Sequence, residues 1–134
     1  MTEQKRRILI IEDNRSVVEL VAARLEHEGF EVLSAMDGEE GLKRATEHGP
    51  IDLILLDVEL PKLDGFEVCK RLKERPTTAK IPVIIMTGTS RDQENLADRC
   101  LELGVHAWLT KPLESKQWLR CIRQALREGG TTDG

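Results

Sequence analysis

The sequence predicts an α/β fold in which five β-strands alternate with five α-helices along the chain. Five short, mostly apolar runs occur, at residues 8–11, 30–33, 53–56, 83–86 and 107–110. Strands of this kind are expected where helices cover both faces of a parallel sheet. Each run is followed by a longer segment whose apolar residues recur with helical spacing. This strict alternation favours a doubly wound parallel sheet.

The position of three acids agrees with this fold. Five successive βα units favour the flavodoxin-like strand order 2-1-3-4-5, in which ligands bind outside the carboxyl ends of the strands at the topological switch point. In this order the switch point lies between the first and third strands. Glu12 and Asp13 follow the first strand, and Asp57 follows the third. The acids therefore stand where the fold predicts a site.

The expected helices carry recognisable start and stop signals. Their limits are set by Gly29 after the first helix (residues 14–28), Asp37 with Glu40 before the second, Asp64 and Pro76 around the third, Ser90 with Gln93 before the fourth, and Glu114 and Gly129 at the ends of the fifth. The side chains expected to be buried on these helices are Val17, Val18, Val21, Leu25, Leu42, Ala45, Phe66, Cys69, Leu72, Leu96, Ala97, Cys100, Leu101, Trp118, Leu119, Ile122 and Leu126.

Length and composition predict one globular domain over residues 1–128, with a flexible C-terminal tail at 129–134. The net charge is −4 with both signs interspersed, which gives no support for direct nucleic-acid binding. No stretch approaches the roughly 18 apolar residues of a membrane span, and the polar N-terminus does not read as a signal peptide. Three cysteines without CxxC spacing are expected to be reduced thiols. We therefore expect a cytoplasmic protein.

The strand ends supply oxygen ligands suited to Mg²⁺, which prefers an octahedral shell of oxygens and usually keeps several waters. Asp13 and Asp57 are suitable direct ligands, and Glu12 can reach the ion through water. The backbone carbonyl of Glu59 can serve as the remaining protein ligand of the ion. Three carboxylates this close would otherwise raise one another's pKa.

Two further strand ends supply groups for a phosphoryl group. Phosphoryl transfer asks a protein mainly for positioning and charge neutralisation. Asp57 can serve as the nucleophile, Lys111 as a cation for the phosphoryl oxygens, and the Thr87 hydroxyl as a hydrogen-bond donor. Taken singly, each residue would usually be a solvated loop group. Because separated positions agree on one site and one role, the sequence predicts a phosphoryl-accepting aspartate.

These residues resemble the receiver domain of bacterial two-component response regulators, the CheY-like superfamily. The resemblance covers about residues 7–127 and is carried by the stretches IIEDN (10–14), LILLDVELPKLDGFEV (53–68), PVIIMTG (82–88) and AWLTKP (107–112). It implies Glu12 and Asp13 as the acidic pair, Asp57 as the phosphorylated residue, Thr87 as the switch hydroxyl, Lys111 as the family's lysine, and a cis Lys111–Pro112 bond.

The resemblance also implies a signalling function. A sensor histidine kinase or a phosphotransfer protein would pass its phosphoryl group to Asp57 in a Mg²⁺-dependent step, and the chain would not be an enzyme acting on an outside substrate. The acyl phosphate would then bias a surface formed by the fourth helix, fifth strand and fifth helix, which a downstream protein target reads. Candidates on that surface are Leu103, His106, Trp108 and Trp118. A homodimer through the same surface is kept open.

Three departures from the family's usual pattern are present, and the third involves two positions. The switch aromatic, usually Tyr or Phe, falls on Trp108, which is either core filler or a ring that changes rotamer with Thr87. Gly88 stands where Ala is commoner. Glu59 and Thr89 flank the line of water attack, and Glu59 either pairs with Lys111 or hinders hydrolysis of the phosphoaspartate.

Other functions are kept as alternatives. The chain could be the receiver portion of a longer regulator with an output domain. A Mg²⁺-dependent aspartyl-phosphate phosphohydrolase would want an acid two residues after the nucleophile, where Glu59 stands, but also a cap domain. A flavin binder is disfavoured because acids occupy the first loop. His27, His48 and His106 lack zinc-ligand spacing, and no GxxxxGK[ST] phosphate loop is present.

Overall fold

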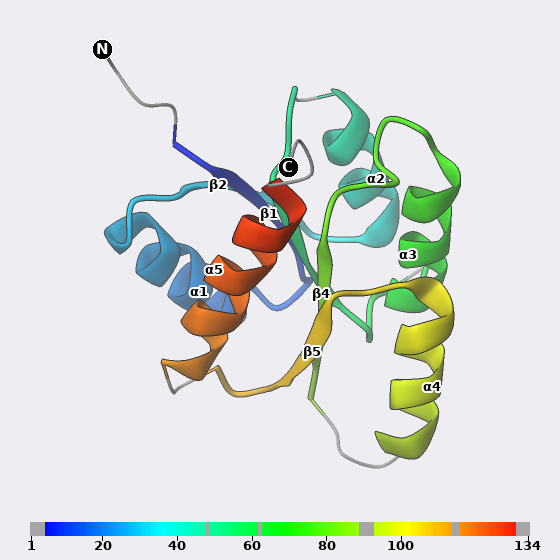
Figure 1. Ribbon diagram of the computed structural model, residues 1–134. Helices are drawn as coiled ribbons and strands as arrows, with labels where there is room; N and C mark the ends of the chain where they lie inside the picture. Colours follow the sequence, from blue (N-terminus) through cyan, green and yellow to red (C-terminus); the bar gives the residue numbers. More distant parts are fainter. Residues whose placement is uncertain (1–4, 48, 62, 89–92, 114–115, 131–134) are drawn as a thin grey trace.

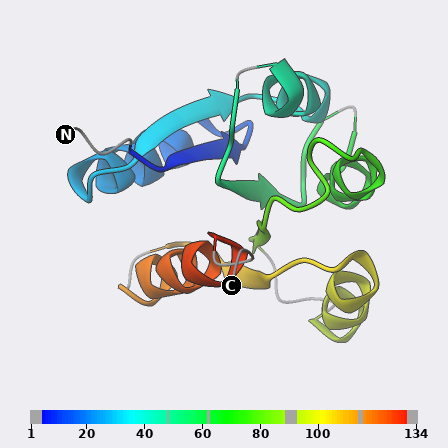
Figure 2. The same ribbon diagram turned by 45° about the horizontal axis from the view of Figure 1, so that its top comes forward.

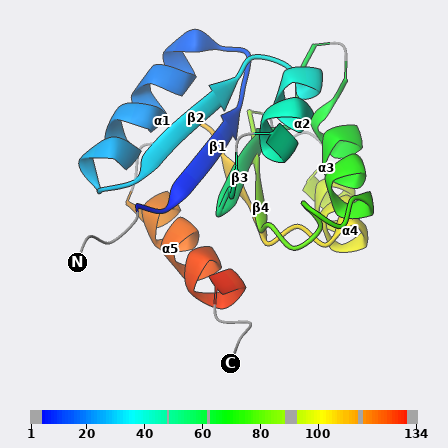
Figure 3. The ribbon, with the colours of Figure 1, turned by 90° about the horizontal axis from the view of Figure 1, so that it is seen from above.

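Five parallel strands form one sheet with the order β2-β1-β3-β4-β5, which confirms the predicted topology. The computed structural model describes residues 5–47, 49–61, 63–88, 93–113 and 116–130. Figures 1 and 3 show the strands side by side and pointing the same way. The strands are β1 (Arg7–Ile11), β2 (Glu31–Ala35), β3 (Leu53–Asp57), β4 (Val83–Thr87) and β5 (Ala107–Thr110).

Helices cover both faces of the sheet. They are α1 (Arg15–His27), α2 (Gly38–Glu47), α3 (Gly65–Glu74), α4 (Gln93–Leu103) and α5 (Gln117–Gly130). Figure 2 shows α1 and α5 (blue and orange to red) on one side and α2, α3 and α4 (teal, green and yellow) on the other. Among the described residues, no helix combines the length and the apolar character needed to cross a membrane.

The core consists of two apolar layers separated by the sheet. Successive residues of a strand point to opposite faces, so Leu9 and Ile11 pack beneath α2, α3 and α4, whereas Ile8 and Ile10 pack beneath α1 and α5. β3 and β4 are buried along their whole length. Burial of each such Leu or Ile side chain stabilises the fold by roughly 1.5–3 kcal/mol. The central strands are thus anchored on both faces, and their carboxyl ends are fixed in space.

The described helix caps follow the sequence signals. Asp64 Oδ1 accepts the backbone N–H of Glu67 at 2.9 Å, which starts α3 as predicted. Asp37 Oδ1 accepts the N–H of Glu40 at 2.8 Å, and the Glu40 carboxylate accepts the N–H of Met36. Such reciprocal bonds satisfy N–H groups that a helix start leaves unpaired. The expected cap at Ser90, the Thr89 position and the helix start at Glu114 lie outside the described residues.

One expectation about the helices was wrong. Leu101 was expected to be buried, but it is 80% exposed. The inward face of α4 follows Leu96, Cys100 and Leu103 at helical spacing, and one residue after Cys100 the helix has already turned Leu101 toward solvent. α5 extends to Gly130, and the flexible tail predicted for residues 129–134 stays a prediction. Residues 131–134 lie outside the described part.

Candidate functional site

The sheet ladder brings the three predicted acids together. Ile11, the last residue of β1, is paired with Leu56 of β3. The next residues along these two strands, Glu12 and Asp57, are therefore neighbours as well. One carboxylate oxygen from each of Glu12, Asp13 and Asp57 lies within 4.8 Å of the others. Glu12 and Asp57 are buried and Asp13 is exposed. The cluster therefore has a buried inner part and an outer acid that faces solvent.

Lys111 supplies the cation of this cluster. Its Nζ pairs with Glu12 Oε1 and lies 3.3 Å from Asp57 Oδ2. The backbone N–H of Lys111 donates to the carbonyl of Thr87 at 2.8 Å, which ties the loop after β5 to the end of β4. The predicted cis bond between Lys111 and Pro112 is confirmed. The side chain of Lys111 therefore reaches the acids from the loop that follows β5.

Two backbone N–H groups orient the buried carboxylates. Glu12 Oε2 accepts the N–H of Asn14 at 3.0 Å, and Asp57 Oδ1 accepts the N–H of Glu59 at 3.1 Å. Asn14 has a second role, because its Oδ1 caps α1 by accepting the N–H groups of Ser16 and Val17. Sequence reasoning gave Asn14 no role, although an Asn just before a helical segment is a recognised capping signal.

The charges of the cluster shift one another's protonation. Burial, together with the nearby charge of Glu12, raises the pKa of Asp57 to about 7. Burial acts on Glu12 in the same direction, but hydrogen bonds from Lys111 and from the Asn14 N–H outweigh it and lower the pKa of Glu12. Burial opposes the charged form of Lys111, yet its bond to Glu12 and the charge of Asp57 raise its pKa. Lys111 therefore compensates the charge of Glu12 more fully than that of Asp57.

This donor set fits a hard divalent cation. The site offers carboxylate oxygens from three residues, and one lysine balances only part of their charge. Oxygen donors with surplus negative charge are what Mg²⁺ and similar ions prefer. Within the described residues, this cluster is the only group of three or more His, Cys, Asp or Glu side chains that could hold a metal ion. His27 and His106 do not belong to it, and His48 lies outside the described part.

Gly65 shapes the loop that follows Asp57. A Cβ atom at this position would lie 2.3 Å from the Asp57 carbonyl oxygen and 2.8 Å from the Val58 Cα, so no other residue fits without movement. The Gly65 N–H also donates to the Val58 carbonyl at 2.9 Å. Sequence reasoning missed this role. The signal available was a Gly directly after the capping Asp64, where a helix former would otherwise be favoured.

Thr87, Gly88 and Glu59 stand together at the mouth of the site. Thr87 ends β4 one residue beyond the partner of Asp57 in the ladder and is buried. A Cβ atom on Gly88 would lie 3.6 Å from Glu59 Oε1, so the Glu59 carboxylate is close to Gly88. Within the part of the chain that is described, Glu59 forms no ion pair with Lys111, which pairs with the inner acids instead.

The two tryptophans lie in different environments. Trp108 is 40% exposed on β5, which does not fit the core-filler alternative. Trp118 is only 6% exposed and packs in the layer beneath α1 and α5. Leu103 and His106 are half-buried. Of the four surface candidates, Trp108 is therefore the aromatic that a partner can reach.

Comparisons with known proteins agree with this site. The sequence matches the response regulator receiver domain family over residues 8–123. It is 41% identical over 122 residues to the alkaline phosphatase synthesis transcriptional regulatory protein PhoP of Bacillus subtilis, covering 91% of this chain and 49% of that protein. It is 40% identical over 121 residues to the response regulator PleD of Caulobacter vibrioides, covering 90% of this chain and 26% of that protein. The chain spans about half the length of the first curated relatives it matches, or less.

Solved structures share the fold. A CheY-like response regulator receiver domain protein from Methanospirillum hungatei superposes with a TM-score of 0.85 at 27% identity, over 98% of this chain and all of the other. A response regulator receiver domain protein from Clostridium thermocellum gives a TM-score of 0.83 at 29% identity, over 94% of this chain and 98% of the other. With the family match over residues 8–123 and the predicted strand order, these similarities identify the chain as a member of the response regulator receiver domain family.

Proposed function

We propose that this receiver domain accepts a phosphoryl group on the carboxylate of Asp57 from a phosphohistidine of a sensor histidine kinase or a phosphotransfer protein. In this step the P–N bond of the phosphohistidine breaks, a P–O bond to Asp57 forms, and the imidazole leaves with the electron pair. The observation that carries the proposal is the position of Lys111 Nζ, 3.3 Å from Asp57 Oδ2, beside a three-carboxylate cluster. The product is a phosphoaspartate on the chain itself.

We further propose that Mg²⁺ is the resident ion. Asp13 and Asp57 would hold it directly, with Glu12 through water and the Glu59 backbone carbonyl as a further ligand. When bound, Mg²⁺ supplies positive charge that offsets the carboxylates and the incoming phosphoryl oxygens. The fit rests on the oxygen donors and on the surplus negative charge of the cluster.

The chain's own residues do the remaining work. The Glu59 N–H holds Asp57 Oδ1, which leaves the other oxygen facing Lys111. Lys111 would exchange part of its contact with Glu12 for the oxygens of the arriving phosphoryl group. Thr87 is buried at the end of β4, next to β3, and its hydroxyl is therefore the group proposed to donate a hydrogen bond to another oxygen of the phosphoryl group. Charge that develops on the phosphoryl oxygens is thus met by donors already close by.

The proposed readout is a change in the surface formed by α4, β5 and α5. Movement of Thr87 toward the phosphoryl group would be felt at Trp108, which lies one strand away in the sheet. A downstream protein that binds one state better would complete the signal, since a ligand shifts a two-state equilibrium only by its differential affinity. The proposed place of action is the cytoplasm, where histidine kinases use ATP. Pairing of two copies through the same surface is a further proposal.

A second proposal concerns the length of the natural regulator. The first curated relatives are about twice as long as the region they share with this chain, and two of them carry the words transcriptional regulatory protein in their names. The chain is therefore proposed to act either alone or as the receiver portion of a regulator with an output domain. A phosphohydrolase with an aspartyl-phosphate intermediate is the disfavoured alternative, because the family found here is a signalling family.

Intact-mass measurement after incubation with Mg²⁺ and acetyl phosphate tests the proposal. The expected result is the gain of one phosphate, which is lost in Asp57→Asn and after removal of the ion with EDTA. Asp52→Asn is the matched control, because Asp52 lies at the other end of β3, where its side chain accepts the N–H of Arg7. A folded protein that gains no phosphate, or an adduct that survives in Asp57→Asn, contradicts the proposal. Turnover of an outside phosphate ester would favour the phosphohydrolase.

A further inference from the structure

A groove between α3 and α4 lies beside the carboxylate cluster and shares Thr87 and Glu59 with the mouth of that site. Its main pocket has a volume of about 400 Å³ and is walled by Val58, Thr87, Phe66 and residues of α4. A second pocket of about 260 Å³ continues along the same two helices and shares Phe66, Arg99 and Glu102 with the first. Volumes of a few hundred Å³ are typical of ligand sites. The groove is therefore large enough for several side chains of a partner.

The polar groups around the main pocket carry excess negative charge. Among the described residues that line it, Glu59, Asp98 and Glu102 contribute three carboxylates, against the guanidinium of Arg99. None of these carboxylates forms an ion pair or a side-chain hydrogen bond with any residue in the described ranges. Elsewhere on the surface acids do find partners, as Glu40 does with Arg44 and Glu28 with Arg123. The carboxylates of the groove are thus available to a cation from outside.

The position of Arg99 explains why these acids stay unpaired. Its guanidinium carbon lies 3.8 Å from the centre of the Phe66 ring, a cation–π contact that bridges α4 and α3. Glu102 follows three residues later on the same helix, a spacing that often allows an ion pair. The stacked Arg99 does not make that pair, so its charge stays on the aromatic face. The same contact shows that the apolar surface of this groove accepts a guanidinium.

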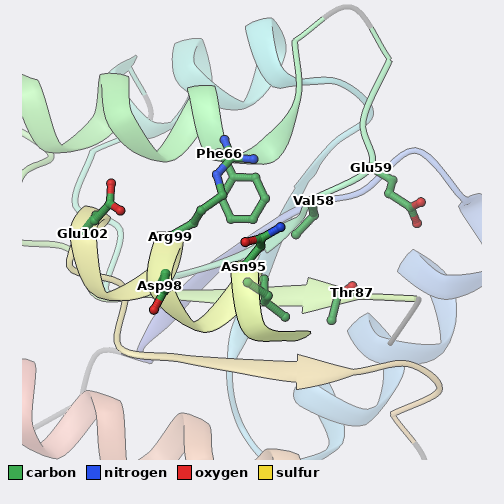
Figure 4. Close-up of a pocket in the computed structure, with 9 residues that line it drawn as sticks. Val58, Glu59, Phe66, Thr87, Asn95, Asp98, Arg99 and Glu102 are labelled. Carbon is green, nitrogen blue, oxygen red and sulfur yellow. The ribbon is translucent and has the colours of Figure 1, made fainter. Parts of the chain in front are cut away.

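The layout of the groove suits an extended segment rather than a single ion. Figure 4 shows Glu102 and Glu59 at opposite ends of the pocket, with Phe66 and Asn95 between them. Val58 and Leu96 add apolar surface to this middle part. Acids at both ends and an apolar middle complement a chain with basic side chains on either side of an apolar one. Nucleic acid and anionic lipid would be repelled by the same carboxylates.

We propose that the α3–α4 groove is a docking site for an extended segment of a protein partner that carries two basic residues flanking an apolar residue. The basic side chains would pair with Glu59 at one end and with Glu102 and Asp98 at the other. The apolar side chain would lie against Phe66 and Leu96. This proposal does not depend on phosphorylation of Asp57, because the groove is present in the structure without it.

A titration of the full chain followed by two-dimensional ¹H–¹⁵N NMR tests this site. The probe is an acetylated, amidated tripeptide of arginine, leucine and arginine. We expect saturable shifts for Phe66, Thr87 and the α4 amides, in the millimolar to sub-millimolar range. Exchange of both arginines for citrulline keeps the shape but removes the charge, and it should weaken binding at least about four-fold, because each of the two exposed ion pairs contributes about a two- to five-fold change. A glycine in place of leucine should weaken binding as well.

Two protein variants decide whether the groove is responsible. Asp98→Asn combined with Glu102→Gln should weaken peptide binding several-fold. Glu26→Gln combined with Glu47→Gln removes the same charge from α1 and α2 and should leave it unchanged. The proposal is overturned if no saturable shift appears at the groove, or if both double variants lose binding equally. It is also overturned if spermidine displaces the peptide at equal concentration, or if the groove shifts arise from pairing of two copies without peptide, measured by translational diffusion.

Discussion

Lys111 Nζ contacts two buried acids at once: it pairs with Glu12 Oε1 and lies 3.3 Å from Asp57 Oδ2. One cation therefore shares its charge between two carboxylates on neighbouring strands. Because Glu12 also accepts the N–H of Asn14, its charge is the better compensated of the two. This unequal sharing leaves Asp57 as the carboxylate that an arriving positive ion stabilises most.

Replacement of Lys111 by glutamine should destabilise the protein when Mg²⁺ is absent. The change leaves two buried carboxylates without their cation, and the loss of one partner of a buried pair is costly. Because Lys111 is partly exposed, we expect a loss of about 2 kcal/mol in the free energy of unfolding at neutral pH. Urea unfolding measures it, with the exposed Lys43→Gln on α2 as the control. Equal stability of the two variants would contradict a structural role for this cation.

The raised pKa of Asp57 predicts a pH dependence in the ion-free protein. A carboxyl whose pKa is about 7 in the folded state and near 3.9 when unfolded binds its proton more tightly when folded. Stability should therefore fall as pH rises from about 4 to 7. Asp57→Asn removes this titration. As pH rises from about 4 to 7, the free energy of unfolding of the variant should therefore increase relative to that of the wild type by up to about 4 kcal/mol.

Urea unfolding in EDTA at several pH values measures this difference. Asp52→Asn, at the other end of β3, provides the matched control and should show no such trend. Addition of Mg²⁺ should reduce the gain, because a bound cation favours the ionised carboxylate. A constant difference between wild type and Asp57→Asn from pH 4 to 8 would show that the Asp57 pKa is not raised.

Removal of the outer acid should weaken ion binding with little effect on the fold. Asp13 is exposed, so Asp13→Asn costs little stability but withdraws a charged ligand from the cluster. An ion that binds only the folded state raises the thermal midpoint by mass action. We expect Mg²⁺ to raise the midpoint of the wild type and to do so much less for Asp13→Asn. The exposed Glu47→Gln on α2 should respond like the wild type, and an undiminished response of Asp13→Asn would remove Asp13 from the ligand set.

Two glycines near the site predict opposite results for the same substitution. A methyl group at Gly65 would lie 2.3 Å from the Asp57 carbonyl oxygen, so Gly65→Ala must displace the backbone that carries the Asp57 carboxylate. We expect a loss of about 1–3 kcal/mol and slower phosphorylation by acetyl phosphate. At Gly88 the nearest atom to a new methyl group is Glu59 Oε1 at 3.6 Å, an ordinary contact. Gly88→Ala should therefore keep stability within about 1 kcal/mol.

Chemical denaturation and intact-mass time courses on the two alanine variants give the comparison. If Gly65→Ala is as stable and as quickly phosphorylated as Gly88→Ala, the close approach of α3 to the Asp57 carbonyl has no part in shaping the site.

The sequence predicted the parts of this molecule that depend on periodic patterns. Strand order and the gathering of Glu12, Asp13 and Asp57 follow from apolar strands and from the alternation of strands and helices. Contacts between elements that are distant in the sequence could not be predicted from it, because they depend on exact backbone positions. The close approach at Gly65 and the stacking of Arg99 on Phe66 are of this kind.

Leu101 shows a second limit of sequence reasoning. An apolar residue beside a true core position looks buried in the sequence, whereas the phase of the helix turns it outward to 80% exposure. Whether Glu59 pairs with Lys111 was equally undetermined from the sequence. It is settled in the structure by the ladder between β1 and β3, which places Glu12 next to Asp57.

Trp108 provides an optical test of the link between the site and the surface. Its ring is 40% exposed on β5, and its ladder partner Ile85 lies two residues before Thr87 on β4. If Thr87 moves toward a phosphoryl group and the indole turns inward, the ring leaves water and its emission should shift to shorter wavelength. Beryllofluoride with Mg²⁺ serves as the stand-in for the phosphoryl group, and Trp118→Phe isolates Trp108 because Trp118 is the other tryptophan.

The control for this measurement is Asp57→Asn in the Trp118→Phe background, which should show no response because it cannot form the adduct. Leu109, the half-buried neighbour of Trp108 on β5, should keep its NMR methyl signals nearly unchanged if the ring alone moves. An emission spectrum that stays constant while the adduct forms by mass would mean that Trp108 is a fixed surface aromatic. The signal would then have to leave the site through α4, whose residues share a pocket with Thr87.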